Sequence, residues 1–213
     1  MERIRPVKIG EIVELFPRQY GKTLGAQKFL NPESNEMYDY ILYLGNPWSS
    51  VVIPFTDKNE VILINQFRYG ADDFVYEFPG GNQKFPKETP AEVARRELLE
   101  ETGYEAGEMA LLTDSHTTLD PASYVSYLYP YIALNCKLVG SEKPDDFDGK
   151  IEVIERVQIL PFDQWLEMVR EGKVIDIKSI TLTYLALMHL KYKIVPPVSV
   201  PDLKSRTFYY QGG

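Results

Sequence analysis

Apolar runs alternate with turn-forming segments along most of the chain, and this pattern predicts a protein built largely on β-strands. The runs are rich in aromatic and β-branched residues, and segments such as GNPWS (45–49) and TDKN (56–59) have turn compositions. The expected strands are residues 38–44, 50–55, 60–67, 74–81, 109–116, 123–134 and 151–160. The last of these shows the alternation of a half-buried strand.

Helical periodicity replaces this alternation in three segments. The predicted helices are residues 90–102, 162–172 and 179–192. The first has explicit end signals, because Thr89 is a good N-cap that can form a capping box with Glu92, and Pro90 suits the first helical position. Gly103 stands where a left-handed residue ends a helix. Many strands with three helices indicate the α+β class, with a mixed sheet packed between helices.

The first predicted helix carries an acidic face beside an apolar one. At about 100° per residue, the apolar stripe consists of Ala91, Ala94 and Leu98, and the acidic face of Glu97, Glu100 and Glu101. Like charges three or four residues apart destabilise a helix. A solvated charged face is one interpretation. The other is a site for a hard divalent cation, since these carboxylates adjoin the apolar stripe and follow a Pro-Gly-Gly turn.

Composition narrows the class of protein. The 213 residues fit one domain, or a domain with a small N-terminal addition, and 44% of them are hydrophobic, enough for a packed core. A formal net charge of -8 argues against nucleic acid as a partner, although metal ions can bridge an acidic protein to a phosphorylated small molecule. The apolar runs are too short to cross a membrane, no secretory h-region precedes the domain, and Cys136 is the only cysteine. We therefore expect a cytoplasmic protein.

The helix and the loop before it resemble the Nudix box, the signature of Nudix hydrolases. That signature reads Gly, five residues, Glu, seven residues, then Arg-Glu-U-X-Glu-Glu-X-Gly-U, where U is bulky and apolar. From Glu88 to Tyr104 the chain matches every defined position, with Tyr104 counted as the final U. It departs before Glu88, because six residues separate Gly81 from Glu88 and Lys87 replaces the usual glycine.

The resemblance implies the Nudix fold, an α/β/α sandwich with a mixed sheet, and hydrolysis of a nucleoside diphosphate linked to another group. Mg²⁺ or Mn²⁺ is the implied cofactor. The implied ligands and catalytic carboxylates are Glu97 and Glu101, with Glu100 sharing that role, and the Gly80 carbonyl is a further metal ligand. The structural positions of the motif fall on Gly81, Glu88, Arg96 and Gly103, with Glu88 and Arg96 pairing to orient the helix against the loop.

Other segments are similar to the ADP-ribose and nucleotide-sugar pyrophosphatase branch of this family. They are NQFRYG, FVYEFPGG and the ending after residue 151. This similarity implies an N-terminal β region (1–50) that serves a homodimer and substrate contacts, a Nudix domain (51–195) and a C-terminal tail (196–213). Arg68 becomes a candidate phosphate contact because its fork suits phosphate oxygens. The alternative is a structural surface arginine.

The general base is expected outside the box, in the acidic loop PDDFDGKIE. Asp148 and Glu152 are the candidates, and Asp145 and Asp146 are less favoured. Each could instead be a solvated loop acid. The expected function is cleavage of ADP-ribose or a related nucleotide sugar to a nucleoside monophosphate and a sugar phosphate. The rivals are a dinucleoside polyphosphate or other nucleotide pyrophosphatase, and a non-catalytic nucleotide-sensing domain.

Overall fold

The computed structural model describes residues 5–19, 21–140 and 154–191. The strands there are β1 (Val7–Glu14), β2 (Thr23–Leu30), β3 (Met37–Pro54), β4 (Glu60–Arg68), β5 (Asp73–Glu77), β6 (Gly80–Asn82), β7 (Tyr104–Glu105), β8 (Glu108–Leu111), β9 (Tyr124–Leu134), β10 (Lys137–Leu138) and β11 (Ile154–Pro161). The helices are α1 (Pro90–Thr102), α2 (Phe162–Arg170) and α3 (Ile177–His189). None of the helices in these ranges is long and apolar enough to cross a lipid bilayer.

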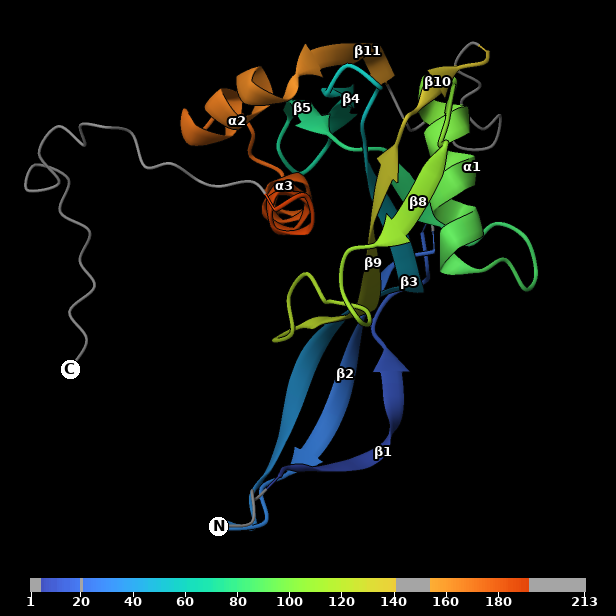
Figure 1. The fold of residues 1–213 in the computed structure, drawn as a ribbon. Coiled ribbons are helices and arrows are strands. Elements are labelled where there is room, and N and C mark those ends of the chain that lie inside the picture. Colours follow the sequence, from blue (N-terminus) through green and yellow to red (C-terminus); the bar gives the residue numbers. More distant parts are fainter. Residues whose placement is uncertain (1–4, 20, 141–153, 192–213) are drawn as a thin grey trace, which may run out of the picture.

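Two sheets form the centre of the molecule. The larger sheet has the order β1-β2-β3-β9-β8, with β6 also paired to β3. Its β3–β9 pair is parallel and its other pairs are antiparallel, so the sheet is mixed. The smaller sheet has the antiparallel order β11-β4-β5. Helix α1 lies on one side of these strands, and α2 and α3 lie on the other (Figure 1).

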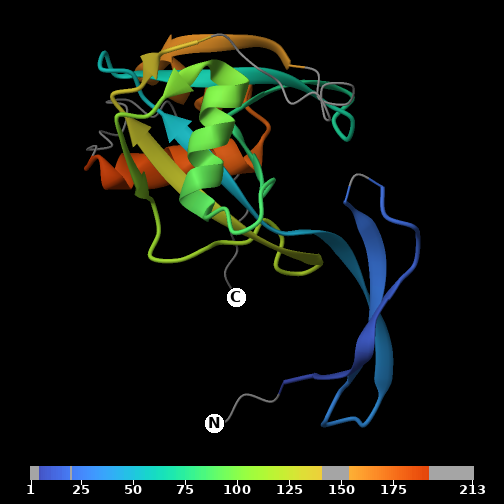
Figure 2. The same ribbon diagram turned by 90° about the vertical axis from the view of Figure 1, so that its right-hand side faces the viewer.

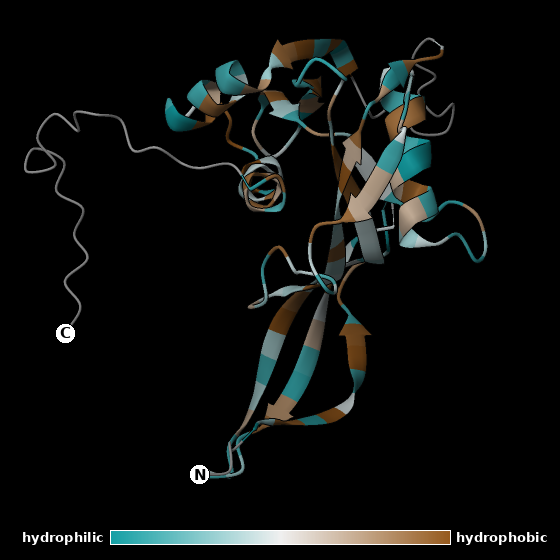
Figure 3. Ribbon diagram, in the orientation of Figure 1, coloured by the Kyte–Doolittle hydropathy of each residue, from teal (hydrophilic) through white to brown (hydrophobic). Residues whose placement is uncertain are grey.

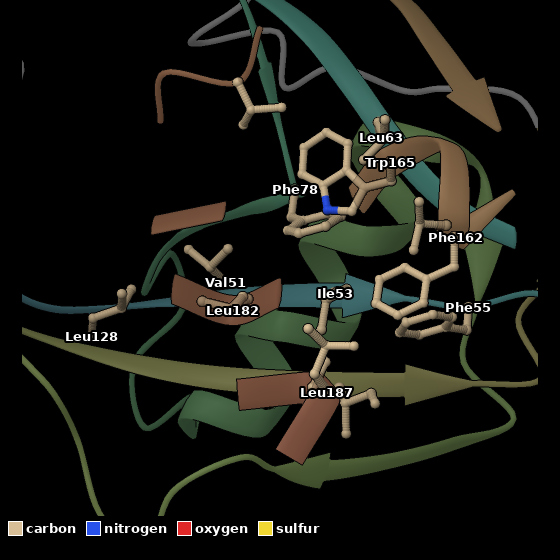
Figure 4. Close-up of a cluster of buried hydrophobic side chains, with 14 residues drawn as sticks. Val51, Ile53, Phe55, Leu63, Phe78, Leu128, Phe162, Trp165, Leu182 and Leu187 are labelled. Atoms are coloured by element: carbon tan, nitrogen blue, oxygen red, sulfur yellow. The ribbon is translucent and has the colours of Figure 1, made fainter. Parts of the chain in front are cut away.

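Alternate residues of the central strands feed two hydrophobic cores. On β3, Val52 packs with Ala94 and Leu98 of α1. Its neighbours Val51 and Ile53 belong instead to the core that α2 and α3 cover. Trp165, Phe162 and Phe78 fill that second core, as Figure 4 shows. A sheet buried on both faces by helices is the α/β/α sandwich expected of this chain, and the α+β class is confirmed.

The N-terminal strands form an arm that projects from this body (Figure 2). Within the part of the chain that the structure describes, β1 pairs with β2 alone, and β2 pairs with β1 and the first part of β3. Hydrophobic residues occur along the arm, as its brown segments in Figure 3 show, and many of their side chains are exposed. The most exposed of them are Val13, Phe16, Met37 and Ile41.

The predicted turn at 45–49 is wrong, because β3 runs unbroken from Met37 to Pro54 and joins the arm to the body. The pairing of β3 with β9 slips between Leu44 and Trp48. An irregularity of this kind tolerates Pro47, which has no N–H to donate to the ladder. The turn composition therefore marks an irregularity in the pairing of β3 and not the end of a strand.

Other boundaries shift by a few residues. The predicted strand 74–81 is two strands, β5 and β6, interrupted at Phe78 and Pro79. The strand predicted to reach residue 116 ends at Leu111. Helix α3 begins at Ile177 because Asp176 caps it, accepting a hydrogen bond from the Ser179 N–H.

The packing of α1 gives a test with adjacent leucines. Leu98 is fully buried against β3 and β4, whereas Leu99 is 36% exposed. We expect Leu98→Ala to lower the free energy of unfolding by about 2–5 kcal/mol, because it removes buried atoms and leaves a cavity. Leu99→Ala should change it by about 0.5 kcal/mol or less. Urea denaturation of both variants measures the difference, and equal losses would contradict the packing of α1.

Candidate active site

Local signals fix both ends of α1 and hold the acidic face in register. The Thr89 side chain accepts a hydrogen bond from the Glu92 N–H, and the Glu92 carboxylate accepts one from the Thr89 N–H at 2.7 Å. Gly103 takes φ 75° and donates its N–H to the Leu99 carbonyl, as predicted for the C-terminal residue. Ser50 of β3 donates to the Pro90 carbonyl at 2.8 Å, which ties the first turn to the sheet.

The Arg96 guanidinium is the centre of the candidate site. Its Nε donates to Glu88 Oε1 at 2.7 Å, and its Nη1 donates to Glu97 Oε1 at 2.8 Å and to Glu100 Oε2 at 3.0 Å. Its Nη2 donates to the Asn82 carbonyl at 2.8 Å. Burial lowers the pKa of Arg96, but the neighbouring carboxylates raise it by more than burial lowers it. The net pKa is therefore raised, and the side chain stays charged. One arginine thus joins the loop before α1 to the acidic face of α1.

The loop 82–88 closes around the Glu88 carboxylate. Glu88 Oε2 accepts the backbone N–H groups of Lys84 at 2.9 Å and Phe85 at 3.3 Å. Burial raises the pKa of Glu88, but hydrogen bonds from Arg96 and these N–H groups leave it below its ordinary value. Lys87 adopts φ 69°, the left-handed region that glycine enters without cost. Lys87 therefore occupies, with a full side chain, a backbone conformation that favours glycine.

Strand β6 contacts α1 at two glycines. A side chain at Gly81 would overlap the Glu97 carboxylate, so Glu97 lies directly against the β6 backbone. The buried Glu101 accepts the Gly80 N–H on Oε2 at 2.9 Å. The structure thus brings Gly80, Gly81, Glu97 and Glu101 together, with Glu100 beside them through Arg96.

The donor set suits a hard divalent cation in type and in charge. Four formal carboxylates, from Glu88, Glu97, Glu100 and Glu101, face the two cations Lys84 and Arg96, which leaves two negative charges in excess. Oxygen ligands with that excess are what Mg²⁺ or Mn²⁺ requires. Among the described residues, however, no three acidic, histidine or cysteine side chains are already gathered as a metal-binding group. Arg96 Nη1 lies between Glu97 and Glu100, which explains why these carboxylates do not converge.

A second ion-pair network lies on the chain just before Gly80. Arg68 of β4 donates to Glu77 of β5 through Nε and Nη2, both at 2.6 Å, in a two-pronged pair. Lys178 of α3 contacts the same carboxylate at 3.1 Å. Burial raises the pKa of Glu77, but these cations leave it below its ordinary value. Arg68 itself is 38% exposed, and the pair fixes the direction of its guanidinium.

Glu77, Lys178 and Lys84 are the site residues that sequence reasoning did not single out. Glu77 belongs to the EFPGG segment, but its partners from β4 and α3 follow no local spacing. Lys178 lies 101 residues from Glu77 along the chain. Lys84 gave no signal beyond its place in the lengthened loop. The general-base candidates Asp148 and Glu152 lie outside the described residues, as do Asp145 and Asp146.

Comparison with known proteins matches the NUDIX domain model to residues 46–179. Three relatives cover much of the chain. A methanol dehydrogenase activator from Bacillus methanolicus is 32% identical over 151 residues, 70% of this chain and 77% of the relative. An ADP-ribose pyrophosphatase from Bacillus subtilis (strain 168) is 28% identical over 148 residues, 70% of this chain and 74% of the relative. A GDP-mannose pyrophosphatase from Escherichia coli (strain K12) is 31% identical over 156 residues, 67% of this chain and 74% of the relative.

A solved structure shares the fold. The crystal structure of an ADP compounds hydrolase superposes with a TM-score of 0.73, covering 90% of this chain and 97% of the other, at 18% identity. At that identity the likeness concerns the fold alone. Since it covers 90% of the chain, it extends beyond the residues matched by the NUDIX domain model.

The two glycines of β6 give a test of the site geometry. A Cβ at Gly80 would lie 2.5 Å from the Ser50 carbonyl oxygen and 2.8 Å from Val51 Cα, so Gly80→Ala must open the β3–β6 pair. We expect it to cost about 1–3 kcal/mol of unfolding free energy. At Gly81 the three atoms nearest to the added carbon all belong to the flexible end of Glu97. Gly81→Ala should therefore fold with nearly unchanged stability but bind Mn²⁺ about ten-fold more weakly.

Urea denaturation and Mn²⁺ titration of both variants separate the two effects. Each variant serves as the other's control, because each adds one methyl group to the same short strand. A large loss of stability in Gly81→Ala, or unchanged Mn²⁺ binding in that variant, would contradict the contact between Gly81 and Glu97.

Proposed function

The chain belongs to the NUDIX family, and from that membership we propose that it is a divalent-metal-dependent pyrophosphatase that cleaves ADP-ribose or a related nucleotide sugar. The products are a nucleoside monophosphate and a sugar phosphate. The observation that carries this proposal is that Arg96 holds Glu97 and Glu100 while Glu101 accepts the Gly80 N–H, so that all three carboxylates lie beside the glycines of β6. The pyrophosphatase names of two of the relatives support the substrate class.

In this proposal the metal ligands are the carboxylates of Glu97, Glu100 and Glu101 and the carbonyl of Gly80. Mg²⁺ or Mn²⁺ held there would neutralise phosphate charge, polarise the P–O bonds and lower the pKa of the attacking water. The protein's own contribution is alignment. The short Arg96–Glu88 pair keeps loop 82–88 against α1, so the carboxylates of α1 keep their place beside β6.

Arg68 is proposed to contact a phosphate oxygen of the substrate. The guanidinium is partly exposed, and its two-pronged pair with the buried Glu77 restricts its rotation, so little entropy is lost when it binds an anion. Lys178 is a second cation that pairs with the Glu77 carboxylate. The general base is proposed to be Asp148 or Glu152, which the structure does not describe.

We propose that residues 1–50 serve a homodimer through the projecting arm. Strands β1 and β2 carry exposed apolar side chains, among them Val13 at 63%, and Phe16 in the connection between them is 60% exposed. A small isolated sheet is marginally stable in water, and a large exposed apolar surface usually marks an interface. A cytoplasmic location is also proposed, since Cys136 is the single cysteine of the sequence and is buried.

A hydrolysis screen tests the activity. ADP-ribose, GDP-mannose, other nucleotide sugars, NADH and a dinucleoside tetraphosphate are incubated with Mg²⁺ or Mn²⁺, and the products are identified. We expect ADP-ribose or a nucleotide sugar to be cleaved fastest, and excess EDTA to abolish turnover. Preference for the dinucleoside tetraphosphate would favour the other pyrophosphatase class. Nucleotide binding without any turnover would instead favour a sensing domain.

Glu101→Gln tests the assignment of the metal ligands. The glutamine keeps an oxygen that can accept the Gly80 N–H, so the fold should persist while an anionic ligand is lost. We expect kcat to fall by about 10²-fold or more. The control is Glu105→Gln, an exposed acid on β7, which should leave kcat unchanged. Activity of Glu101→Gln within a few-fold of the unaltered protein would remove Glu101 from the ligand set.

Sedimentation velocity at micromolar concentration tests the dimer. We expect a dimer for the unaltered chain and a shift toward monomer for Phe16→Asp, because a charge in a buried apolar interface is costly. Ile175→Asp is the matched control, since Ile175 is also exposed, at 62%, but lies outside the arm. A monomeric unaltered chain would exclude this role for the arm.

A further inference from the structure

Lys84 lies at the edge of the acidic cluster, in the loop that is one residue longer than the Nudix signature. Its Nζ is 3.9 Å from Glu100 Oε1, and its side chain is 36% exposed. Its backbone N–H is held by Glu88 Oε2 at 2.9 Å. The backbone of Lys84 is therefore held in place, while its long side chain extends toward Glu100 of α1.

Glu100 thus forms two ion pairs, and one of them is stronger than the other. Arg96 Nη1 donates a hydrogen bond to Oε2 at 3.0 Å from a guanidinium that is only 14% exposed. The 3.9 Å separation of Lys84 from Oε1 is an ion pair beyond hydrogen-bond distance, between partly exposed groups. Exposed ion pairs of this kind contribute little. Lys84 is therefore the partner of Glu100 that is more easily displaced.

A divalent cation at Glu100 would meet the positive charge of Lys84 directly. Two like charges a few ångströms apart repel, so the lysine must weaken metal binding while it remains on Glu100. An ammonium on a flexible stem, with three donors, can turn to another anion without moving the backbone. In a metal-loaded site that accepts a diphosphate, the nearest new anion is a phosphate oxygen.

We propose that Lys84 exchanges partners during substrate binding. It competes with the divalent cation for Glu100, and once displaced it binds a phosphate oxygen of the substrate. The lengthened loop 82–88 thus supplies a cation beside the acidic face of α1. This inference rests on the proposed function for its second step, and its first step concerns metal binding alone.

The first experiment titrates Mn²⁺ into the full chain by calorimetry, with no nucleotide present. We expect Lys84→Gln to bind Mn²⁺ about three- to ten-fold more tightly, because the competing charge is gone. Lys84→Arg, which keeps the charge, should bind close to the unaltered protein. Lys87→Gln is the control, since Lys87 carries the same charge in the same loop but makes no ion pair among the described residues. Circular dichroism checks that every variant is folded.

The second experiment measures KM and kcat for the best substrate of the screen at saturating Mn²⁺. We expect Lys84→Gln to raise KM about three- to ten-fold with kcat changed less, and Lys84→Arg to restore much of the KM. Unchanged Mn²⁺ affinity in Lys84→Gln, or equal tightening in Lys87→Gln, would overturn the competition for Glu100. Tighter Mn²⁺ binding with an unchanged KM would overturn the exchange. If no nucleotide is hydrolysed, the proposed function fails, and the Mn²⁺ titration still decides the competition.

Discussion

The site depends on a single guanidinium placed among carboxylates. Arg96 is mostly buried and donates to the loop through Glu88 and the Asn82 carbonyl, and to α1 through Glu97 and Glu100. Without this cation, the four carboxylates would face one another with much less compensating charge, and their mutual repulsion would favour separation of the loop from the helix. The positive charge of Arg96 joins the loop to α1. Together with Lys84 it leaves the four carboxylates with an excess of two negative charges, which one divalent cation can neutralise.

The five residues from Glu77 to Gly81 are held from both sides of the sheet. At one end, the Glu77 carboxylate lies between cations from β4 and α3, and the Phe78 N–H donates to Ser179 at the start of α3. At the other end, the Gly80 N–H donates to Glu101 of α1. Helices on opposite faces therefore fix one short segment. That arrangement limits the motion of the backbone where a metal ligand is proposed.

The packing and caps of α1 offset the repulsion among its glutamates. Three glutamates on one face oppose helix formation, as does the absence of a basic residue in the last turn. The capping box, the left-handed Gly103 and the buried Leu98 and Ala94 offset this cost. A helix whose apolar stripe packs into the core can keep an acidic face that an isolated peptide could not. Conflicts of this kind between local preference and structure are expected at functional sites.

The sequence by itself determined what local hydrogen bonds and spacing control. The bounds of α1, its caps, its acidic face and the α+β class followed from residues within a few positions of one another, because helix periodicity and capping are short-range. Only the tertiary structure decided the rest. Strand β3 continues through the turn-like segment 45–49 because β9 pairs with it on both sides of the irregularity, and the Glu77–Lys178 contact joins residues 101 apart. The need for glycine at position 81 comes from the approach of Glu97, which the packing of α1 on the sheet imposes. Long-range pairing and close packing leave no periodic signal in one sequence, so these contacts appear only when the chain is folded.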